Sequence, residues 1–254
     1  MSTREGRHEY FSEFLEKYPV DKTRIPESYL DAYPFAKEIG CDPSLRDERL
    51  APFPRTHRAI QTHRREYFAA ITHLDSQIGR VLDHLKKSGQ EDETIIFFTA
   101  DHGLSIGHHG LMGKQNAYDV SVRVPFVIAG PGIQSRSKNS QPIYVQDAMA
   151  TSIALSGAEK QDFVEFQDLR PMITGGKSKY TDGIYFAYLD LQRSINIDSM
   201  KLIEYPKANV SRLYDLKTDP QEMHDLAGLR EYADQAKVLH TKLEVLALRY
   251  ELKK

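Results

Sequence analysis

The sequence has few of the residues that build disulfide-stabilised, zinc-binding or membrane-spanning proteins. Cys41 is its one cysteine among 254 residues. This excludes an internal disulfide framework and any zinc site built on several cysteines. No apolar run approaches the ~18 residues of a membrane span, and the N-terminus shows no apolar stretch typical of a secretory signal peptide. We therefore expect neither a covalent scaffold nor a bilayer to support the fold.

An excess of either charge is also missing. Lysine and arginine number 34 against 36 aspartates and glutamates, so the net charge is -2. This balance gives no electrostatic reason to expect nucleic acid as a partner. The composition is 40% hydrophobic and 28% charged, which excludes a disordered or fibrous chain. The length suits one large or two modest domains with a buried core.

The first 56 residues are rich in proline and charge. They indicate a short helix near Glu9–Lys17, followed by a long and mostly irregular segment. Irregular segments of this length in compact proteins are usually functional or disordered. The prolines that interrupt any longer period are Pro19, Pro26, Pro34, Pro43, Pro52 and Pro54.

Residues 57–88 change to a helical pattern. Their apolar residues recur at steps of three and four, which predicts one amphipathic helix. Lys86 and Lys87 form a basic end and Gly89 follows, as expected where a helix stops. The apolar stripe consists of Ile60, Tyr67, Ile71, Leu74, Ile78, Val81, Leu82 and Leu85.

Two continuous apolar runs, residues 94–100 and 124–129, have strand length. A helix, a short loop and such a run predict a strand buried on both faces in an α/β sheet. The segment between the runs is rich in glycine and histidine. Ligands of open α/β sheets bind beyond the carboxyl ends of strands, so we expect the chemistry in residues 101–123.

The rest of the chain has shorter elements. Residues 131–143 read as a surface loop, and a helix is predicted for residues 144–156, ending near Gly157. The later segments predict a small antiparallel sheet and a terminal helix. The predicted strands are 183–189, 200–205 and 211–216, and the helix is roughly 229–251, with Tyr232, Ala236, Leu239, Leu243 and Leu246 on one stripe.

One constellation combines groups that could bind a cation and an anion. Asp101 and His102 follow the first apolar run directly, and Lys114 comes twelve residues after His102. A carboxylate at a strand end can bind a hard cation, and a nearby lysine can neutralise an anionic substrate oxygen. The alternative is a histidine-rich surface loop in which Asp101 caps a turn.

The residues around this constellation resemble the sulfatase family of the alkaline-phosphatase-like superfamily. The run TIIFFTADHGLSIGHHGLMGKQNAYDVSVRVPFVIAGPGI, residues 94–133, is very similar to that family. Residues 65–85 look like the helix that precedes this strand in sulfatases. Residues 46–56, RDERLAPFPRT, and 212–227, RLYDLKTDPQEMHDLA, resemble two further family segments, although His224 stands where asparagine is more common. The similarity extends from about residue 9 to 254.

The resemblance implies roles for particular residues. Asp101 and His102 match a pair that binds calcium, and Lys114 matches the catalytic lysine that holds the sulfate ester oxygen. Other residues could contact substrate or only stabilise their loops by hydrogen bonds. These are His108, His109, Gln115, Asn116 and Arg193, together with Arg46, Asp47 and Glu48, which could equally be a solvated charge run.

Other family motifs are not found in this chain. Sulfatases carry a Cys-x-Pro-Ser-Arg type motif whose cysteine becomes the formylglycine nucleophile, and an upstream Asp-Asp pair that completes the calcium site. Cys41 lies in Cys-Asp-Pro-Ser-Leu-Arg, which is one residue too long and too far downstream, so we interpret it as a loop cysteine. The family also has a His-x-Pro type segment that supplies a catalytic histidine. No proline follows His8 at that spacing, so we assign His8 no role. We expect a C-terminal portion of a sulfatase with an incomplete set of Ca²⁺ ligands, inactive in isolation.

The expected fold class is α/β, the alkaline-phosphatase-like (sulfatase) sandwich. Its central sheet would be incomplete, and a small C-terminal antiparallel sheet and a terminal helix would follow. We predict a partial catalytic α/β domain over residues 1–157 and a C-terminal α+β subdomain over residues 158–254. The run 94–100 would then expose an apolar face or an unpaired edge.

The activity that the resemblance implies is hydrolysis of sulfate esters, on a sulfated small molecule or carbohydrate. Two other hypotheses stay open. One is a phosphate or phosphonate ester hydrolase of the same superfamily, and the other is a catalytically inactive remnant or binding module. The resemblance to sulfatases implies a periplasmic or extracellular localisation, and the N-terminal residues by themselves give no support for it.

Overall fold

The computed structural model describes residues 12–251, and the chain divides into two compact units. The first unit comprises the described residues up to 36, residues 41–94 and residues 104–113. The second unit comprises residues 37–40, 95–103 and 114–251. The units thus alternate along the chain, and the domain boundary expected at 157/158 stays a prediction.

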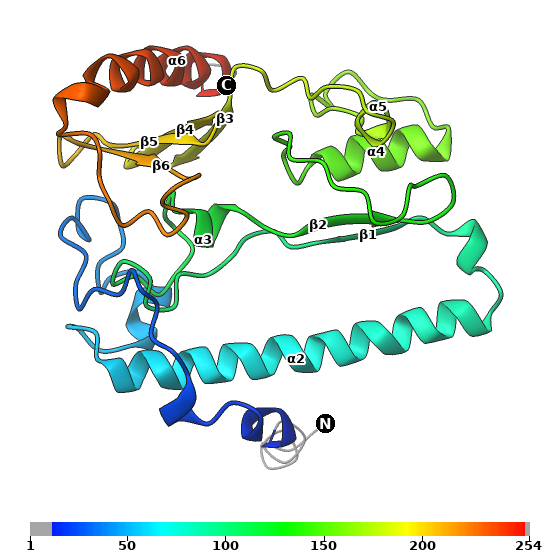
Figure 1. Cartoon of the computed structure of the whole chain (residues 1–254), viewed down its shortest axis with the longest axis horizontal. Coiled ribbons are helices and arrows are strands. Elements are labelled where there is room, and N and C mark those ends of the chain that lie inside the picture. The colour runs from blue at the N-terminus through cyan, green and yellow to red at the C-terminus, as the bar shows by residue number, and fades with distance from the viewer. Residues whose placement is uncertain (1–11, 252–254) are drawn as a thin grey trace. The chain divides into compact units, whose positions relative to one another are not determined.

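Helix α2, His57–Lys87, is the longest element of the first unit (Figure 1). Its start is capped because the Thr56 side chain accepts a hydrogen bond from the Ala59 amide at 3.3 Å. Its end is followed by Gly89 at φ +73°, a conformation that glycine adopts without strain. Both ends confirm the helix predicted for residues 57–88.

The apolar stripe of α2 is buried only in part. Ile60 and Ala69 are fully buried. In the C-terminal half, Leu74 and Val81 are 56% and 68% exposed. The helical period therefore gave the correct element, but within its unit the second half of the helix does not contribute to a core.

The segment before α2 is irregular, as expected. Residues 12–16 are helical, while the start of the helix expected near Glu9–Lys17 lies outside the described residues. Two short 3-10 helices follow, η1 at Val20–Lys22 and η2 at Asp47–Leu50. The unit's apolar core combines this segment with α2 and the 104–113 loop through Ala51, Ile60, Ile106 and Met112.

The second unit contains a two-stranded antiparallel sheet, β1 at Ile96–Thr99 and β2 at Phe126–Ala129. Phe98 pairs with Val127, and these side chains are 43% and 53% exposed. The expectation of strands buried on both faces is wrong for this unit, because none of its described elements covers that face. The expected exposure of an apolar face is observed.

A four-stranded antiparallel sheet forms the main core of the second unit, in the order β3–β4–β5–β6. Helix α6, Ala233–Glu251, lies across it (Figure 1), following the short η4 at Arg230–Tyr232. The core contains Ile195, Leu202, Leu213, Leu239, Leu243 and Leu246, so the predicted stripe of the terminal helix is confirmed. The strands are β3 at Ile184–Tyr188, β4 at Gln192–Ile197, β5 at Met200–Tyr205 and β6 at Val210–Asp215. Strand β4 was not predicted.

The remaining elements are short. Helix α3 spans Asp119–Val122, α4 spans Asp147–Ser156 and α5 spans Arg170–Ile173, and η3 covers Glu91–Glu93. Helix α4 begins at Asp147, a fully buried carboxylate that accepts hydrogen bonds from the Gln167 amide and the Tyr180 hydroxyl. Burial raises the pKa of the Tyr180 hydroxyl. Polar contacts of Asp147 therefore connect the start of α4 to the later segments that carry Gln167 and Tyr180.

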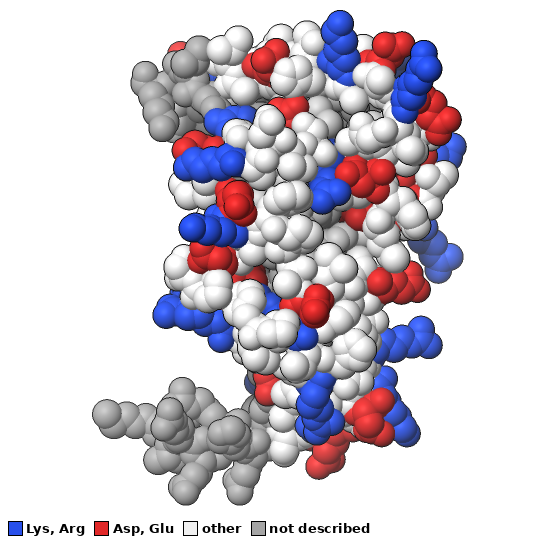
Figure 2. Space-filling model, turned by 90° about the vertical axis from the view of Figure 1, so that its left-hand side faces the viewer, with Lys and Arg blue, Asp and Glu red and all other residues white. Residues whose placement is uncertain are grey.

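The surface is mixed in charge. On the face drawn in Figure 2, basic and acidic side chains are interspersed and neither sign forms a continuous patch. Among the described residues, no helix combines the length and apolar character needed to cross a bilayer. Together the described elements make a mixed α/β fold.

Candidate active site

Asp101 and His102 lie where β1 ends, in the second unit. Gly103, the next residue, donates its amide to the Ser121 carbonyl at 2.8 Å. A Cβ on Gly103 would lie 2.0 Å from the Val120 carbonyl oxygen, so a side chain there would require the backbone to shift. This close backbone contact fixes the chain just after the two predicted ligands.

The two side chains face each other. The Asp101 carboxylate accepts the His102 amide at 2.9 Å, and its other oxygen lies 3.4 Å from His102 Nε2. His102 Nδ1 lies 2.9 Å from the Gly103 carbonyl, which can only accept, so Nδ1 carries a proton. In the neutral ring the lone pair is then on Nε2, beside an exposed carboxylate. A cation could be bound by both groups.

These two groups do not make a complete calcium site. Calcium takes six to eight oxygen ligands, and here the chain offers one carboxylate and one imidazole nitrogen. Within residues 12–251, no group of three or more histidine, cysteine, aspartate or glutamate side chains is arranged to hold a metal ion. The described residues therefore fit at most part of a metal site.

Lys114 belongs to the same unit as Asp101 and His102. Its amide donates to the Gln115 side-chain oxygen at 3.1 Å, and its carbonyl accepts the Asn116 amide at 2.8 Å. Its side chain is half-buried, and no carboxylate of the described chain lies within ion-pair distance of its ammonium group. An unpaired ammonium on a fixed backbone is suited to hold an anionic oxygen.

The residues after Lys114 hold the turn in place. Asn116 is fully buried, and its side-chain oxygen accepts the Tyr118 amide at 3.2 Å. The Gln192 amide nitrogen on β4 donates to the Gln115 carbonyl at 2.7 Å and to the Ile39 carbonyl at 2.8 Å. For Asn116 these contacts favour the loop-stabilising interpretation over direct substrate contact.

A buried charge cluster anchors the next turn of the same segment. Lys201 Nζ lies 2.6 Å from Asp119 Oδ1 and 2.8 Å from Glu222 Oε1. The second Glu222 oxygen accepts the Asp119 amide at 2.6 Å. The side chains of Lys201 and Glu222 are 2% and 1% exposed. The C-terminal motif therefore supports the segment that carries Lys114, a role that sequence patterns did not indicate.

His108 and His109 belong to the first unit. His108 Nδ1 lies 2.8 Å from the Ser28 hydroxyl, and burial and then the Arg64 charge lower the pKa of His108 to about 4. His109 is buried, and its amide donates to the Ser28 carbonyl at 2.7 Å. His108 is thus neutral at pH 7, and both histidines have local structural contacts.

The loop that carries these histidines is clamped by a buried ion pair. Glu48 and Arg55 are both buried and form a salt bridge, and the Glu48 carboxylate accepts the amides of Met112 and Gly113. Burial raises the pKa of the Glu48 carboxyl, while the Gly113 amide and the Arg55 charge lower it. Glu48 is therefore not a solvated charge, and its contacts favour a structural role. It fixes the two residues before Lys114.

Two other predicted positions have clear locations. Arg193 lies on β4, paired with Ala187 on β3 and Glu204 on β5, and is half-buried. Its role as a substrate residue stays a prediction. Cys41 is 1% exposed, which agrees with its interpretation as an ordinary loop cysteine.

The chain matches two sulfatase family descriptions. The first, Sulfatase, covers residues 4–158, and the second, N-sulphoglucosamine sulphohydrolase C-terminal, covers residues 107–249. The chain is 30% identical over 204 residues to the N-acetylglucosamine-6-O-sulfatase of Bacteroides thetaiotaomicron. That match covers 75% of this chain and 37% of the relative.

Solved structures agree with these matches. A protein in complex with its substrate D-glucosamine-2-N,6-O-disulfate is 28% identical with a TM-score of 0.71, over 87% of this chain and 47% of that one. The phosphonate monoester hydrolase of Silicibacter pomeroyi is 26% identical with a TM-score of 0.75, over 91% of this chain and 51% of that one. This chain thus spans about half of each solved relative and less of the curated one. It belongs to the sulfatase family.

Proposed function

We propose that this chain supplies part of the active site of a sulfatase that hydrolyses sulfate esters of carbohydrates. The observation that carries this proposal is the Lys114 ammonium, which has no ion-pair partner among the described residues and belongs to the same unit as Asp101 and His102, in a chain of the sulfatase family. The carbohydrate preference is supported by the name of one relative and by the bound substrate of another.

Lys114 would act on the oxygens of the sulfate ester. Negative charge on these oxygens is stabilised by a cation that is already in position, and such a group needs no reorganisation during the reaction. The Lys114 backbone is held by the Gln115 side chain and by the Asn116 amide. Removal of one such preorganised group typically costs about 10²–10³ in rate.

Asp101 and His102 would contribute two ligands to a bound Ca²⁺ ion. When bound, the cation would withdraw charge from the sulfate oxygens. The His102 ring is oriented for this role by the Nδ1 contact to the Gly103 carbonyl, which leaves Nε2 toward Asp101. The remaining oxygen ligands would come from groups other than the described residues of this chain.

The nucleophile would also come from outside residues 12–251. We propose the formylglycine of the family rather than Cys41, since Cys41 is buried and its motif has the wrong spacing. The 254-residue chain alone would then be inactive, although it would keep its fold and the Lys114 segment.

The test is a fusion protein. The part of the Bacteroides thetaiotaomicron N-acetylglucosamine-6-O-sulfatase that precedes its match would be joined ahead of residue 1, and sulfate release from N-acetylglucosamine 6-sulfate measured by ion chromatography. We expect release by the fusion, none by the chain alone, and a large loss in Lys114→Ala. A fusion that unfolds cooperatively and keeps full activity with Lys114→Ala and Asp101→Ala would exclude the proposed roles.

A second candidate is phosphonate monoester hydrolysis, which the Silicibacter pomeroyi neighbour favours. The same fusion distinguishes the two when it is assayed with a phenyl phosphonate monoester. Faster turnover of the phosphonate than of any sulfate ester would assign the second activity. Turnover of neither ester by a folded fusion would favour the inactive remnant or binding module.

A further inference from the structure

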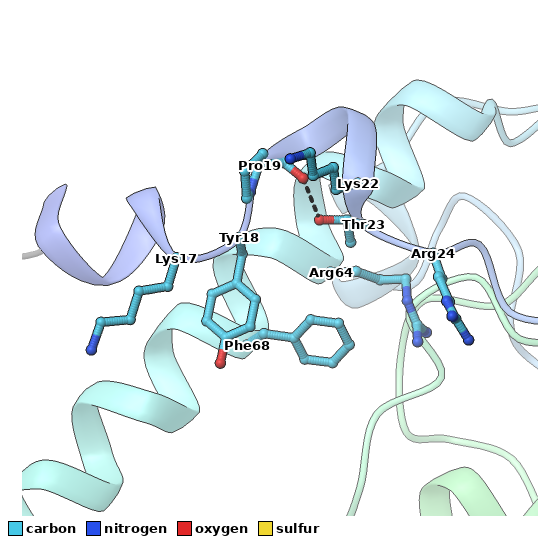
Figure 3. Close-up of a pocket in the computed structure, with 8 residues that line it drawn as sticks. All are labelled: Lys17, Tyr18, Pro19, Lys22, Thr23, Arg24, Arg64 and Phe68. Atoms are coloured by element: carbon cyan, nitrogen blue, oxygen red, sulfur yellow. Dashed lines mark hydrogen bonds between the residues drawn. The ribbon is translucent and has the colours of Figure 1, made fainter.

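The first unit contains a pocket that is lined by none of the residues proposed above for sulfate hydrolysis. Its volume is about 390 Å³, and it lies between the segment around η1 and helix α2 (Figure 3). Four cationic side chains line it, Lys17, Lys22, Arg24 and Arg64, and no acidic residue does. Two aromatic rings, Tyr18 and Phe68, line it as well.

The walls of this pocket are tied to each other. The Tyr18 hydroxyl lies 2.7 Å from the Thr72 hydroxyl, and the Tyr18 and Phe68 rings are 5.7 Å apart. The Gln61 side-chain amide donates to the Thr23 carbonyl at 3.1 Å. These bonds connect the segment to α2 on either side of the pocket, so the pocket is formed before a ligand arrives.

The positive charge of the pocket is not neutralised within the described chain. Arg64 is half-buried, its Nε has no hydrogen-bond partner, and its Nη1 is 3.5 Å from the Ile106 carbonyl. Burial lowers the pKa of Arg64, while burial and then the Arg64 charge lower the pKa of His108. No ion pair to Lys17, Lys22 or Arg24 occurs among residues 12–251.

A cation that is partly removed from water without a partner is unfavourable. By contrast, Arg55 and Lys201, which are fully buried in the described part of the chain, both have carboxylate partners. In Figure 3 the Arg24 and Arg64 side chains end on the same side of the pocket, with the Phe68 ring next to Arg64. Guanidinium groups of this kind match oxyanions because each presents a planar fork of donors.

We propose that this pocket is an accessory binding site for a sulfated saccharide, lined by residues other than Lys114, Asp101 and His102. Arg64 and Arg24 would hold the sulfate, and the Tyr18 and Phe68 rings would pack against the apolar face of the sugar. The volume is in the range of small-ligand sites and suits one sugar ring. The oxyanion class follows from the pocket itself, while the choice of a saccharide rests on the proposed function.

The experiment is isothermal titration of the 254-residue chain with N-acetylglucosamine 6-sulfate. N-acetylglucosamine, glucose 6-phosphate and inorganic sulfate are the comparison ligands. We expect the sulfated sugar to bind more tightly than inorganic sulfate, the unsulfated sugar not to bind, and the affinity to fall with added salt. Arg64→Gln should weaken binding at least about tenfold, as for the loss of a charge-assisted hydrogen bond.

Exposed positions keep the test independent of folding. Arg24→Gln and Lys22→Gln replace exposed side chains and should weaken binding severalfold while leaving the unfolding transition unchanged. Arg58→Gln and Lys87→Gln, exposed positions of α2 outside the pocket, are matched controls that should bind as the parent does. Unchanged affinity in both Arg24→Gln and Arg64→Gln would overturn the proposal, as would equal binding of the unsulfated sugar or no binding at all.

Lys114→Ala separates this site from the proposed active site. The variant should keep the affinity of the parent for the sulfated sugar, whether or not the fusion protein proves to be a sulfatase. Loss of binding in Lys114→Ala with full binding in Arg24→Gln would assign the ligand to the Lys114 segment and overturn the accessory site. Equal affinity for glucose 6-phosphate would retain an oxyanion site but overturn its preference for sulfate.

Discussion

The buried cluster of Lys201, Asp119 and Glu222 allows a quantitative prediction. Lys201→Met removes the cation that is 2.6 Å from Asp119 and 2.8 Å from Glu222 and keeps a side chain of similar length. Two carboxylates then remain close together, one of them on a side chain that is 1% exposed. Breaking a buried ion pair from one side costs about 3–5 kcal/mol. This is a large part of the 5–15 kcal/mol that stabilise a typical domain.

The cost should depend on pH in a defined direction. Burial already raises the pKa of Glu222, and the Lys201 charge opposes this rise. Without Lys201 the pKa of Glu222 in the folded variant rises further. The folded variant then retains a proton at pH values where the unfolded chain has lost it, so the variant gains stability as the pH falls. The difference from the parent should be largest at pH 8 and smaller at pH 5.

Urea unfolding followed by far-UV circular dichroism at pH 5, 7 and 8 measures this difference. Lys207→Met is the matched control, because Lys207 pairs at 2.9 Å with a largely exposed Asp190, and exposed pairs contribute about 0–1 kcal/mol. A loss below 1 kcal/mol in Lys201→Met, or an equal loss at pH 5 and pH 8, would refute the reasoning about this cluster.

Three further predictions concern the two units. His108→Gln should keep the contact to Ser28 but flatten the pH dependence of unfolding. Because the pKa of His108 is lowered to about 4 in the folded chain, this residue contributes stability that is lost as the pH falls from about 6.5 toward 4. The difference in urea midpoint between the parent and the variant, measured across this pH range, checks this prediction. Gly103→Ala places a Cβ 2.0 Å from the Val120 carbonyl and should cost at least about 1–3 kcal/mol in urea unfolding; a neutral result would show that the turn is free to shift. Leu243→Ala should cost about 2–5 kcal/mol by the same assay, whereas Leu248→Ala, 60% exposed, should cost far less, and equal losses would contradict the observed core.

Local patterns predicted most elements of the chain. Helices α2 and α6 have long helical periods, and β3, β5 and β6 are apolar enough to be recognised as strands. Strand β4 was missed because its sequence, Gln-Arg-Ser-Ile-Asn-Ile, is mostly polar. Gln192 and Ser194 at its start are nevertheless buried, and the Gln192 side chain donates a hydrogen bond to the Gln115 carbonyl, next to Lys114. A hydrophobicity pattern contains no information on such a partner.

The apolar run at β1 shows a different limit of sequence patterns. Its composition predicts burial on both faces, but burial depends on what covers each face. Among the described residues of its unit, β1 pairs only with β2, and Phe98 and Val127 are exposed on one face of this small sheet. The apolar run predicted the strand correctly, but it contains no information on whether another layer of the fold packs against that strand.

For the candidate site, too, sequence patterns predicted some residues and missed others. Asp101, His102 and Lys114 were predicted because they are close in sequence and match a family segment, and their roles stay predictions. Their supports were missed because the hydrogen-bond partners are far apart in the chain: 64 residues separate Glu48 from Met112, and 103 separate Asp119 from Glu222. No local motif reports contacts at such separations.

The most direct test of the central claim is sulfate release by the fusion protein with and without Lys114. We predict release from N-acetylglucosamine 6-sulfate by the parent fusion and a loss of about 10²–10³ in rate for Lys114→Ala, with Lys87→Ala, an exposed lysine of α2, as active as the parent. Equal rates in the parent and Lys114→Ala would contradict the assignment of Lys114 to the sulfate ester.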